Sequence, residues 1–261
     1  MIGVFDSGLG GLSVLAAIAH ALPRADLCYI ADTAHVPYGE KSEAFIQGRV
    51  LAIGDHLVSL GCGLIVVACN TATVAAIAAL RQRHPQVPVV GVEPGVKPAA
   101  AATRSGHIAV LATEATARSQ RLAHLIRDHA GHLIVRIEPC PGWASRVEML
   151  ELDDPGFAAQ AGSKIEPLLA TGVDQIVLGC THYSFLRPIL APLVKGRAGL
   201  VDVADAVARQ TIRLAGNNAY GKARLMLQAT RHPEHLQAAL PRLGLRWLGD
   251  RTDHPAGICP V

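Results

Sequence analysis

Two segments of this chain carry the same residues at the same spacing, and this near-repeat constrains the fold more than any other feature. Residues 61–71 read Gly-Cys-Gly-Leu-Ile-Val-Val-Ala-Cys-Asn-Thr, and residues 172–182 read Gly-Val-Asp-Gln-Ile-Val-Leu-Gly-Cys-Thr-His. Glycine, Ile-Val and cysteine fall at equal offsets in both. A weaker similarity lies upstream, where residues 2–7 align with residues 108–113. The repeat predicts two related halves in one chain.

Short β-branched runs alternate with longer helical patterns along both halves. This alternation predicts βαβ units, and therefore an α/β fold with mostly parallel sheets. Ser42 is expected to cap a helix that ends before Gly61, and Asp205 to lie in the first turn of another. The expected strands are 2–5, 27–30, 64–68, 88–92, 108–111, 133–137 and 175–178, and the expected helices lie near 12–21, 42–60, 72–84, 114–130, 156–171, 186–195 and 204–215.

Charge and hydropathy exclude several classes of partner. The chain has 24 basic and 21 acidic residues with no basic run or stripe, so the sequence predicts no nucleic-acid binding. Apolar runs such as 64–69 fall far short of the roughly 20 residues of a membrane span, so no membrane partner is expected. The first residues lack a basic region and a cleavage site, which favours the cytoplasm.

The six cysteines lie in different sequence contexts. Cys69 and Cys180 each come directly after an expected strand and precede small polar residues, Asn70-Thr71 and Thr181-His182. Open α/β sheets bind ligands at the carboxyl ends of their strands, so facing halves would bring both thiols to one cleft. The other four are interpreted as reduced structural thiols, because none forms a CxxC pair: Cys28, Cys62, Cys140 and Cys259.

Two facing thiols suit the inversion of a tetrahedral carbon. One group must take a proton from one face while another, in the opposite protonation state, returns a proton to the other face. A free thiol with a pKa near ~8.5 is only a few per cent ionised at neutral pH, so it needs a neighbour that tunes it and relays its proton. Asp6 and His182 are the candidates, although either also suits a purely structural role, Asp6 as a capping residue and His182 as a hydrogen-bonded histidine.

Other motifs are less specific when taken alone. The turn at residues 8–11 does not fit GxGxxG, and no GxxxxGK[ST] occurs, so a nucleotide site has little support, although its glycines would let backbone N–H groups approach an anion. Tyr38-Gly39 lies in a loop that would form another wall of the cleft. Glu148, in a segment with a helical pattern, is either a solvated carboxylate or part of the site.

Seven motifs together resemble the glutamate racemases, in order from residue 2 to about residue 215. As a set they separate the chain from the similar aspartate racemases, whose second cysteine is commonly followed by Thr-Glu; here Thr181 is followed by His182. The motifs are Val4-Phe5-Asp6-Ser7-Gly8-x-Gly10-Gly11, Asp32-Thr33, Pro37-Tyr38-Gly39, Ala68-Cys69-Asn70-Thr71-Ala72, Glu93-Pro94-Gly95, Thr113-Glu114-Ala115-Thr116 and Gly179-Cys180-Thr181-His182-Tyr183.

The resemblance implies two pseudo-symmetric α/β domains, residues 1–92 with 203–261 and residues 93–202, with the active site between them. It implies that Cys69, assisted by Asp6, takes the α-proton of D-glutamate, that Cys180, assisted by His182, takes that of L-glutamate, and that neither pyridoxal phosphate nor a metal is required. It assigns substrate binding to Asp6, Ser7, Tyr38, Gly39, Asn70, Thr71, Thr113, Thr116, Glu148, Thr181 and His182.

The activity expected from this resemblance is racemisation of L- and D-glutamate, which supplies D-glutamate for peptidoglycan. An aspartate or broad-specificity acidic amino-acid racemase is one alternative, and a catalytically silent binding protein on the same fold is another. No sequence pattern indicates the oligomeric state, and a homodimer stays open. The chain departs from the usual family residues at His35, Ser184 and Val203, which puts loop conformation and hinge behaviour in question.

Overall fold

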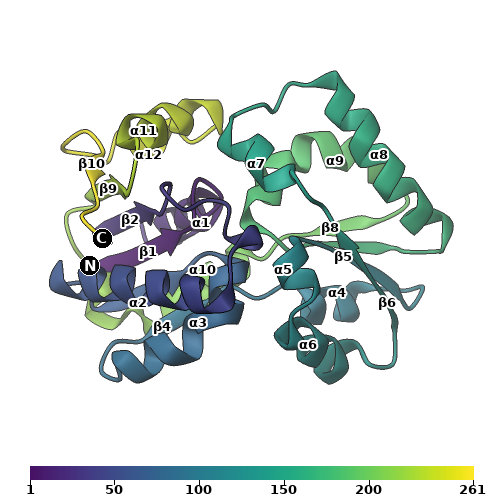
Figure 1. The fold of residues 1–261 in the computed structure, drawn as a ribbon, viewed down its shortest axis with the longest axis horizontal. Helices are drawn as coiled ribbons and strands as arrows, with labels where there is room; N and C mark the ends of the chain where they lie inside the picture. Colours follow the sequence, from purple (N-terminus) through teal and green to yellow (C-terminus); the bar gives the residue numbers. More distant parts are fainter.

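The strands of the computed structural model form two sheets, which lie in two lobes (Figure 1). The structure describes the backbone of residues 1–261 and every side chain except that of Pro155. The first sheet has the order β10-β9-β2-β1-β3-β4, and its strands are β1 Ile2–Asp6, β2 Leu27–Ala31, β3 Leu64–Val67, β4 Val89–Gly91, β9 Leu225–Ala229 and β10 Gly257–Ile258. The second has the order β6-β5-β7-β8, with β5 His107–Ala112, β6 Ile134–Pro139, β7 Gln175–Leu178 and β8 Gly199–Val201.

The two sheets share a topology. The order β2-β1-β3-β4 in the first matches β6-β5-β7-β8 in the second, and neighbouring strands pair in parallel in both. β3 and β7, which lead to the two cysteines of the near-repeat, occupy equivalent places. Gly61 and Gly172 precede these strands with φ of +83° and +86°, a conformation that favours glycine. The predicted α/β fold with mostly parallel sheets is confirmed.

Helices cover both faces of the first sheet. Alternate residues of β1 and β3 point to opposite faces, so Phe5 and Ile65 pack against α2 and α3, while Val4 and Val66 lie in the core shared with α1 and α10. Within the part of the chain that the structure describes, none of the helices combines the length and apolarity that a membrane crossing needs. The α-helices are α1 Leu12–Ala21, α2 Glu43–Ser59, α3 Asn70–Arg83, α4 Val96–Ala102, α5 Glu114–Ala117, α6 Gln120–Ala130, α7 Trp143–Glu148, α8 Pro155–Ala170, α9 Arg187–Val194, α10 Ala204–Ala215, α11 Pro233–Arg242 and α12 Arg246–Gly249, and the 3₁₀ helices are η1 Tyr38–Glu40, η2 Thr181–Leu186 and η3 Gly216–Ala219.

Most predicted elements lie within a few residues of the observed ones, but the single helix expected at 114–130 is wrong. Two hydroxyl caps interrupt it: Thr113 accepts from the Thr116 N–H at the start of α5, and Ser119 accepts from the Leu122 N–H at the start of α6. The cap predicted at Ser42 is confirmed, because its Oγ accepts from the Phe45 N–H at 3.3 Å.

Val203, one of the departures from the family pattern, immediately precedes α10. A valine side chain cannot accept a hydrogen bond, so it cannot cap that helix. Asp202 takes over this role, because its Oδ1 accepts from the Ala204 N–H at 3.0 Å. The buried Val203 side chain instead packs beside Gly95 at the start of α4.

Candidate active site

The two cysteines of the near-repeat lie at equivalent points of the two halves. Cys69 follows β3 at the start of α3, where its Sγ accepts from the Ala72 N–H at 3.4 Å. Cys180 follows β7 at the start of η2. Both side chains are almost fully enclosed, with 6% and 7% of the residue surface exposed. Each thiol therefore sits at the carboxyl end of a parallel strand, where such sheets bind ligands.

Asp6, the last residue of β1, joins the two halves. Its Oδ1 accepts from the Gly8 N–H at 2.8 Å, and its Oδ2 accepts from the Thr181 hydroxyl at 3.0 Å, across 175 residues of sequence. Complete burial raises the pKa of this carboxyl, although His182 and the hydrogen bonds from Gly8 and Thr181 oppose the effect. A carboxyl whose proton is held more tightly than usual is suited to exchange that proton with a neighbour.

Cys69 shares this electrostatic environment. Its Sγ lies 3.9 Å from the Ser7 hydroxyl, next to Asp6. Burial raises the pKa of the thiol, and the charges of Asp6 and Cys180 raise it further. In the enclosed site Cys69 therefore holds its proton, and it is close enough to Cys180 for the two sulfurs to influence one another.

Cys180 has a different partner. Its Sγ lies 3.6 Å from Nδ1 of His182, whose Nε2 is bound to Oε1 of Glu148. Burial alone would lower the pKa of His182, but the Cys180 sulfur and the Glu148 carboxylate outweigh it and raise that pKa well above its usual value. His182 therefore holds its proton more tightly than usual, within reach of the Cys180 sulfur.

Glu148 lies against the candidate site residue His182 and is not a solvated carboxylate. Its side chain is 11% exposed, and Oε1 also accepts from the Leu9 N–H of the glycine-rich turn at 2.6 Å. The glycines of that turn leave the space in which these groups lie. A Cβ on Gly8 would collide with the Glu148 carboxylate, and one on Gly10 would collide with Nδ1 of His182.

A cluster of hydroxyls and one amide lies beside the Cys69 side of the site. The Thr71 hydroxyl is 3.2 Å from that of Thr113 and 3.4 Å from that of Thr116, so the second half meets α3 through polar groups. Gly39 approaches the same cluster, since a Cβ there would lie 3.1 Å from Thr113. Asn70 is 3% exposed, yet neither atom of its amide has a hydrogen-bond partner among the side chains and main chain that the structure describes. A buried amide without partners is costly unless a ligand satisfies it.

The Tyr38 hydroxyl binds Asp32 and not the hydroxyl cluster of Thr71, Thr113 and Thr116. It donates to Asp32 Oδ2 at 2.5 Å, and Arg49 holds both oxygens of the same carboxylate at 2.9 Å. Tyr38 thus anchors the η1 loop. Of the expected binding pair Tyr38 and Gly39, it is Gly39 that faces Thr113. No sequence motif pointed to Arg49, which lies 17 residues beyond Asp32.

One cavity beside these groups is small. Between η1 and α7 it has a volume of about 50 Å³, and Gly39, Thr113 and Cys140 are among its lining residues. Small-molecule sites usually measure about 300–1,000 Å³. Two larger hollows also border residues of the candidate site: one of about 570 Å³ is lined by Thr71 and Thr116, and one of about 530 Å³ is lined by Glu148 and His235. Both thiols are buried in this structure.

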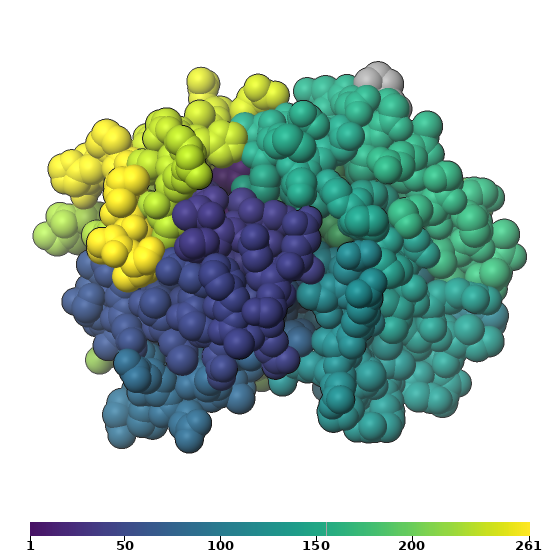
Figure 2. Space-filling view, in the orientation of Figure 1, coloured from purple at the N-terminus to yellow at the C-terminus, as the bar shows by residue number. Residues whose placement is uncertain are grey.

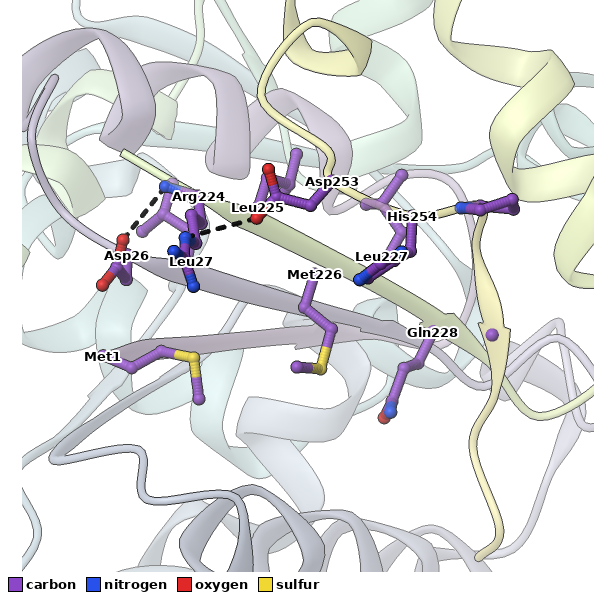
Figure 3. A pocket seen from close by; sticks show the side chains of 12 residues that line it. Met1, Asp26, Leu27, Arg224, Leu225, Met226, Leu227, Gln228, Asp253 and His254 are labelled. Atoms are coloured by element: carbon purple, nitrogen blue, oxygen red, sulfur yellow. Dashed lines mark hydrogen bonds and ion pairs between the residues drawn. The ribbon is translucent and has the colours of Figure 1, made fainter. Parts of the chain in front are cut away.

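A separate groove of about 370 Å³ runs along β9 and is shown in Figure 3. Met1, Leu27 and Leu225 place it at the amino ends of parallel strands, the edge opposite Asp6. Ligands of such sheets bind at the carboxyl ends. The charges of Arg224 and Asp253 on its rim satisfy one another at 3.2 Å in solvent. The groove is therefore not the candidate site.

Comparison with known proteins agrees with this geometry. Residues 2–211 match the model of the Asp/Glu/Hydantoin racemase family. The glutamate racemase of Ectopseudomonas mendocina is 49% identical over 93% of this chain and 94% of its own length. The glutamate racemase of Pseudomonas aeruginosa is 47% identical over 100% of this chain and 92% of its own length. The crystal structure of the Escherichia coli glutamate racemase in complex with L-glutamate and activator UDP-MurNAc-ala superimposes with a TM-score of 0.84 at 33% identity, covering 98% of this chain and 97% of the other.

The fold and the paired thiol sites thus define an amino-acid racemase of the two-lobed α/β type. The chain belongs to the Asp/Glu/Hydantoin racemase family, among its glutamate racemases.

Proposed function

We propose that this protein is a glutamate racemase that interconverts L- and D-glutamate with two cysteines and supplies D-glutamate for peptidoglycan. One observation carries the proposal: Cys69 with Asp6 and Cys180 with His182 form two acid/base pairs at matched strand ends, and the bond from Thr181 to Asp6 joins them into one site. The relatives in which the same fold bears the glutamate racemase name support the choice of substrate.

The protonation states of the two pairs give the reaction a direction. Burial and the charge of Asp6 raise the pKa of Cys69, which therefore holds its proton, while protonated His182 lies 3.6 Å from the Cys180 sulfur. In this state Cys180 is the base that takes the α-proton of L-glutamate, and Cys69 is the acid that protonates the opposite face. Reversal of both states gives the D-to-L reaction.

The difficult step is the loss of a weakly acidic α-proton. Donors already in place must stabilise the negative charge that develops on the substrate, and a closed site without bulk water strengthens them. The unpartnered amide of Asn70 and the hydroxyls of Thr71, Thr113 and Thr116 supply such donors. These groups lie beside the Cys69 side, where a substrate carboxylate can bridge the two halves.

We propose further that the chain divides into residues 1–92 with 203–261 and residues 93–202. The sheets support this division, because the first takes strands from 2–91 and 225–258 and the second from 107–201. We also propose a cytoplasmic location, since all six cysteines are free thiols and a reducing compartment preserves them.

The first experiment is incubation of the purified protein with L-glutamate in heavy water, without added cofactor. Optical rotation is expected to decay while deuterium enters the α-position. Aspartate under the same conditions distinguishes the broad-specificity alternative, which would turn over both substrates at similar rates. A protein inert toward both would support the silent binding protein instead.

Gly10→Ala is expected to lower kcat/KM for glutamate by roughly 10²-fold without unfolding the protein. The added Cβ would collide with Nδ1 of His182, and a misplacement of about 1 Å at a catalytic group has an effect of this size. Steady-state kinetics measures it. Gly48→Ala is the matched control, because a Cβ at Gly48, in α2, meets nothing within 4 Å. Equal activity of the two variants would contradict the placement of His182.

The raised pKa of His182 predicts a stability contribution that depends on pH. Because the folded protein binds this proton more tightly than the unfolded chain, the contribution is complete below the unfolded pKa of about 6.5 and is lost as pH rises through the folded value. The free energy of unfolding of the wild type, relative to that of His182→Gln, should therefore fall as pH rises above about 6.5. Urea titrations across this range measure the difference, and a difference independent of pH would rule out the charged imidazole.

A further inference from the structure

Helix α11, near the C-terminus, reaches across the boundary between the two halves and holds the end of α7. Nε2 of His235 lies 2.7 Å from the main-chain carbonyl oxygen of Glu148, and Nη2 of Arg242 donates to the carbonyl oxygen of Leu150 at 3.2 Å. Figure 2 shows the yellow-green C-terminal segment meeting the teal surface of the second half along the upper rim of the boundary. Two donors of one helix thus converge on one turn of the other half.

The main-chain carbonyl groups at the end of α7 need hydrogen-bond donors from outside that helix. The last carbonyl groups of a helix have no partner within the helix, and α7 has only six residues, of which Glu148 is the last. Leu150 follows with φ of +58°, a left-handed conformation that is strained for leucine. Basic side chains that donate to such carbonyls stabilise a helix end. His235 and Arg242 do so from α11.

Glu148 links His235 to His182. His235 contacts the main-chain carbonyl oxygen of Glu148, and the Glu148 side chain contacts the imidazole of His182. Glu148 Oε1 binds Nε2 of His182, and Nδ1 of His182 lies 3.6 Å from the Cys180 sulfur. A shift of the α7 turn would move the Glu148 carboxylate and turn the imidazole away from the thiol. The contacts form one chain that runs from His235 through Glu148 and His182 to Cys180.

We propose that His235 is a positioning residue for proton transfer by Cys180: its hydrogen bond to the Glu148 carbonyl fixes the Glu148–His182 pair against that thiol. This role rests on the proposed glutamate racemase function. It predicts a larger effect on the Cys180 side, because the Cys69 sulfur contacts Ser7 and Ala72 of the other half, and Asp6 meets the Cys180 side through Thr181 and not through α7.

The hydrogen bond also defines the replacements that test it. A carbonyl oxygen only accepts, so His235 must donate its Nε2–H, which it can do whether the ring is neutral or charged. Glutamine carries an amide N–H at a similar distance from the backbone, whereas alanine carries no donor. His232, three residues earlier, is the matched control, because its 62%-exposed imidazole pairs with Glu234 at 3.0 Å on its own helix.

The test compares His235→Ala, His235→Gln and His232→Asn, with asparagine chosen because residue 232 has φ of +52°. The equilibrium constant of a racemisation is one, so His235→Ala must lower kcat/KM equally in both directions, by roughly tenfold or more. Isotope effects show which thiol is slowed. With α-deuterated L-glutamate the substrate isotope effect should rise, because removal of this deuteron by Cys180 becomes limiting. With α-deuterated D-glutamate it should fall, because return of a solvent proton by Cys180 becomes limiting.

Full activity in His235→Gln and His232→Asn, together with these opposite changes in His235→Ala, would support the positioning role. Wild-type kinetics in His235→Ala would overturn it. So would a loss of activity that leaves the ratio of the two isotope effects unchanged, since that pattern marks a general effect on folding. An inactive wild type would instead overturn the proposed function, and the role of His235 with it.

Discussion

Cys69→Ser and Cys180→Ser are each expected to lower kcat/KM for glutamate racemisation by at least about 10²–10⁴-fold, the range that acid/base groups contribute. A serine hydroxyl is a far weaker acid than a thiol, so it can neither take the α-proton nor return one at a useful rate. Both steps of inversion are needed in each turnover. Loss of either sulfur therefore stops inversion in both directions, as circular dichroism of the substrate would show.

The two variants should nevertheless differ in what they retain. In Cys180→Ser the intact Cys69 faces D-glutamate and should still exchange its α-hydrogen with heavy water without inversion. In Cys69→Ser the intact Cys180 should do the same for L-glutamate. Proton NMR of each enantiomer measures this exchange.

Cys62→Ser is the matched control for both, because Cys62 precedes β3 at its amino end, whereas Cys69 follows the carboxyl end of the same strand. The buried side chain of Cys62 packs in the core beside α2 and α3, and this variant should keep full activity. Racemisation that persists in either Cys69→Ser or Cys180→Ser, or exchange of both enantiomers by one variant, would contradict two-base chemistry.

The near-repeat made the central part of this site predictable from sequence. Equal offsets of glycine, Ile-Val and cysteine require equal strand and turn geometry, so Cys69 and Cys180 had to occupy equivalent strand ends in an α/β fold. Gly61 and Gly172 share a positive φ for the same reason. Local patterns also located α1, α10 and β7, because their apolar residues recur with a clear period.

The features that sequence patterns did not predict depend on contacts between distant segments. Glu148 gave only a weak signal, because its burial comes from Leu9 and His182, 139 and 34 residues away. His235 gave none, since its partner is a main-chain carbonyl that any residue would supply. β8, β9 and β10 also escaped prediction. β8 and β10 have three and two residues and lie at the edges of their sheets, and β9, with Met226 exposed, is defined by its pairing with β2 and β10.

Arg49→Met is expected to lower the free energy of unfolding by about 3–5 kcal/mol, the usual result of removing one partner of a buried ion pair. Asp32 is fully buried, and Arg49 donates to both of its oxygens at 2.9 Å. Methionine fills similar space but leaves the carboxylate charge uncompensated, with Tyr38 and Thr230 as its remaining side-chain donors among the described residues. Urea unfolding followed by circular dichroism measures the change.

The controls for this prediction separate burial from charge. Arg83→Met breaks an ion pair to Asp55 in which both side chains are largely exposed, so it should scarcely change the unfolding midpoint. Asp32→Asn combined with Arg49→Met removes the uncompensated charge and should recover part of the lost stability, since the buried group is then neutral and keeps its Tyr38 and Thr230 contacts. Equal midpoints for Arg49→Met and Arg83→Met would show that water reaches Asp32. Loss of the Asp32 cluster should also raise KM for glutamate, because Tyr38 would no longer hold Gly39 against Thr113.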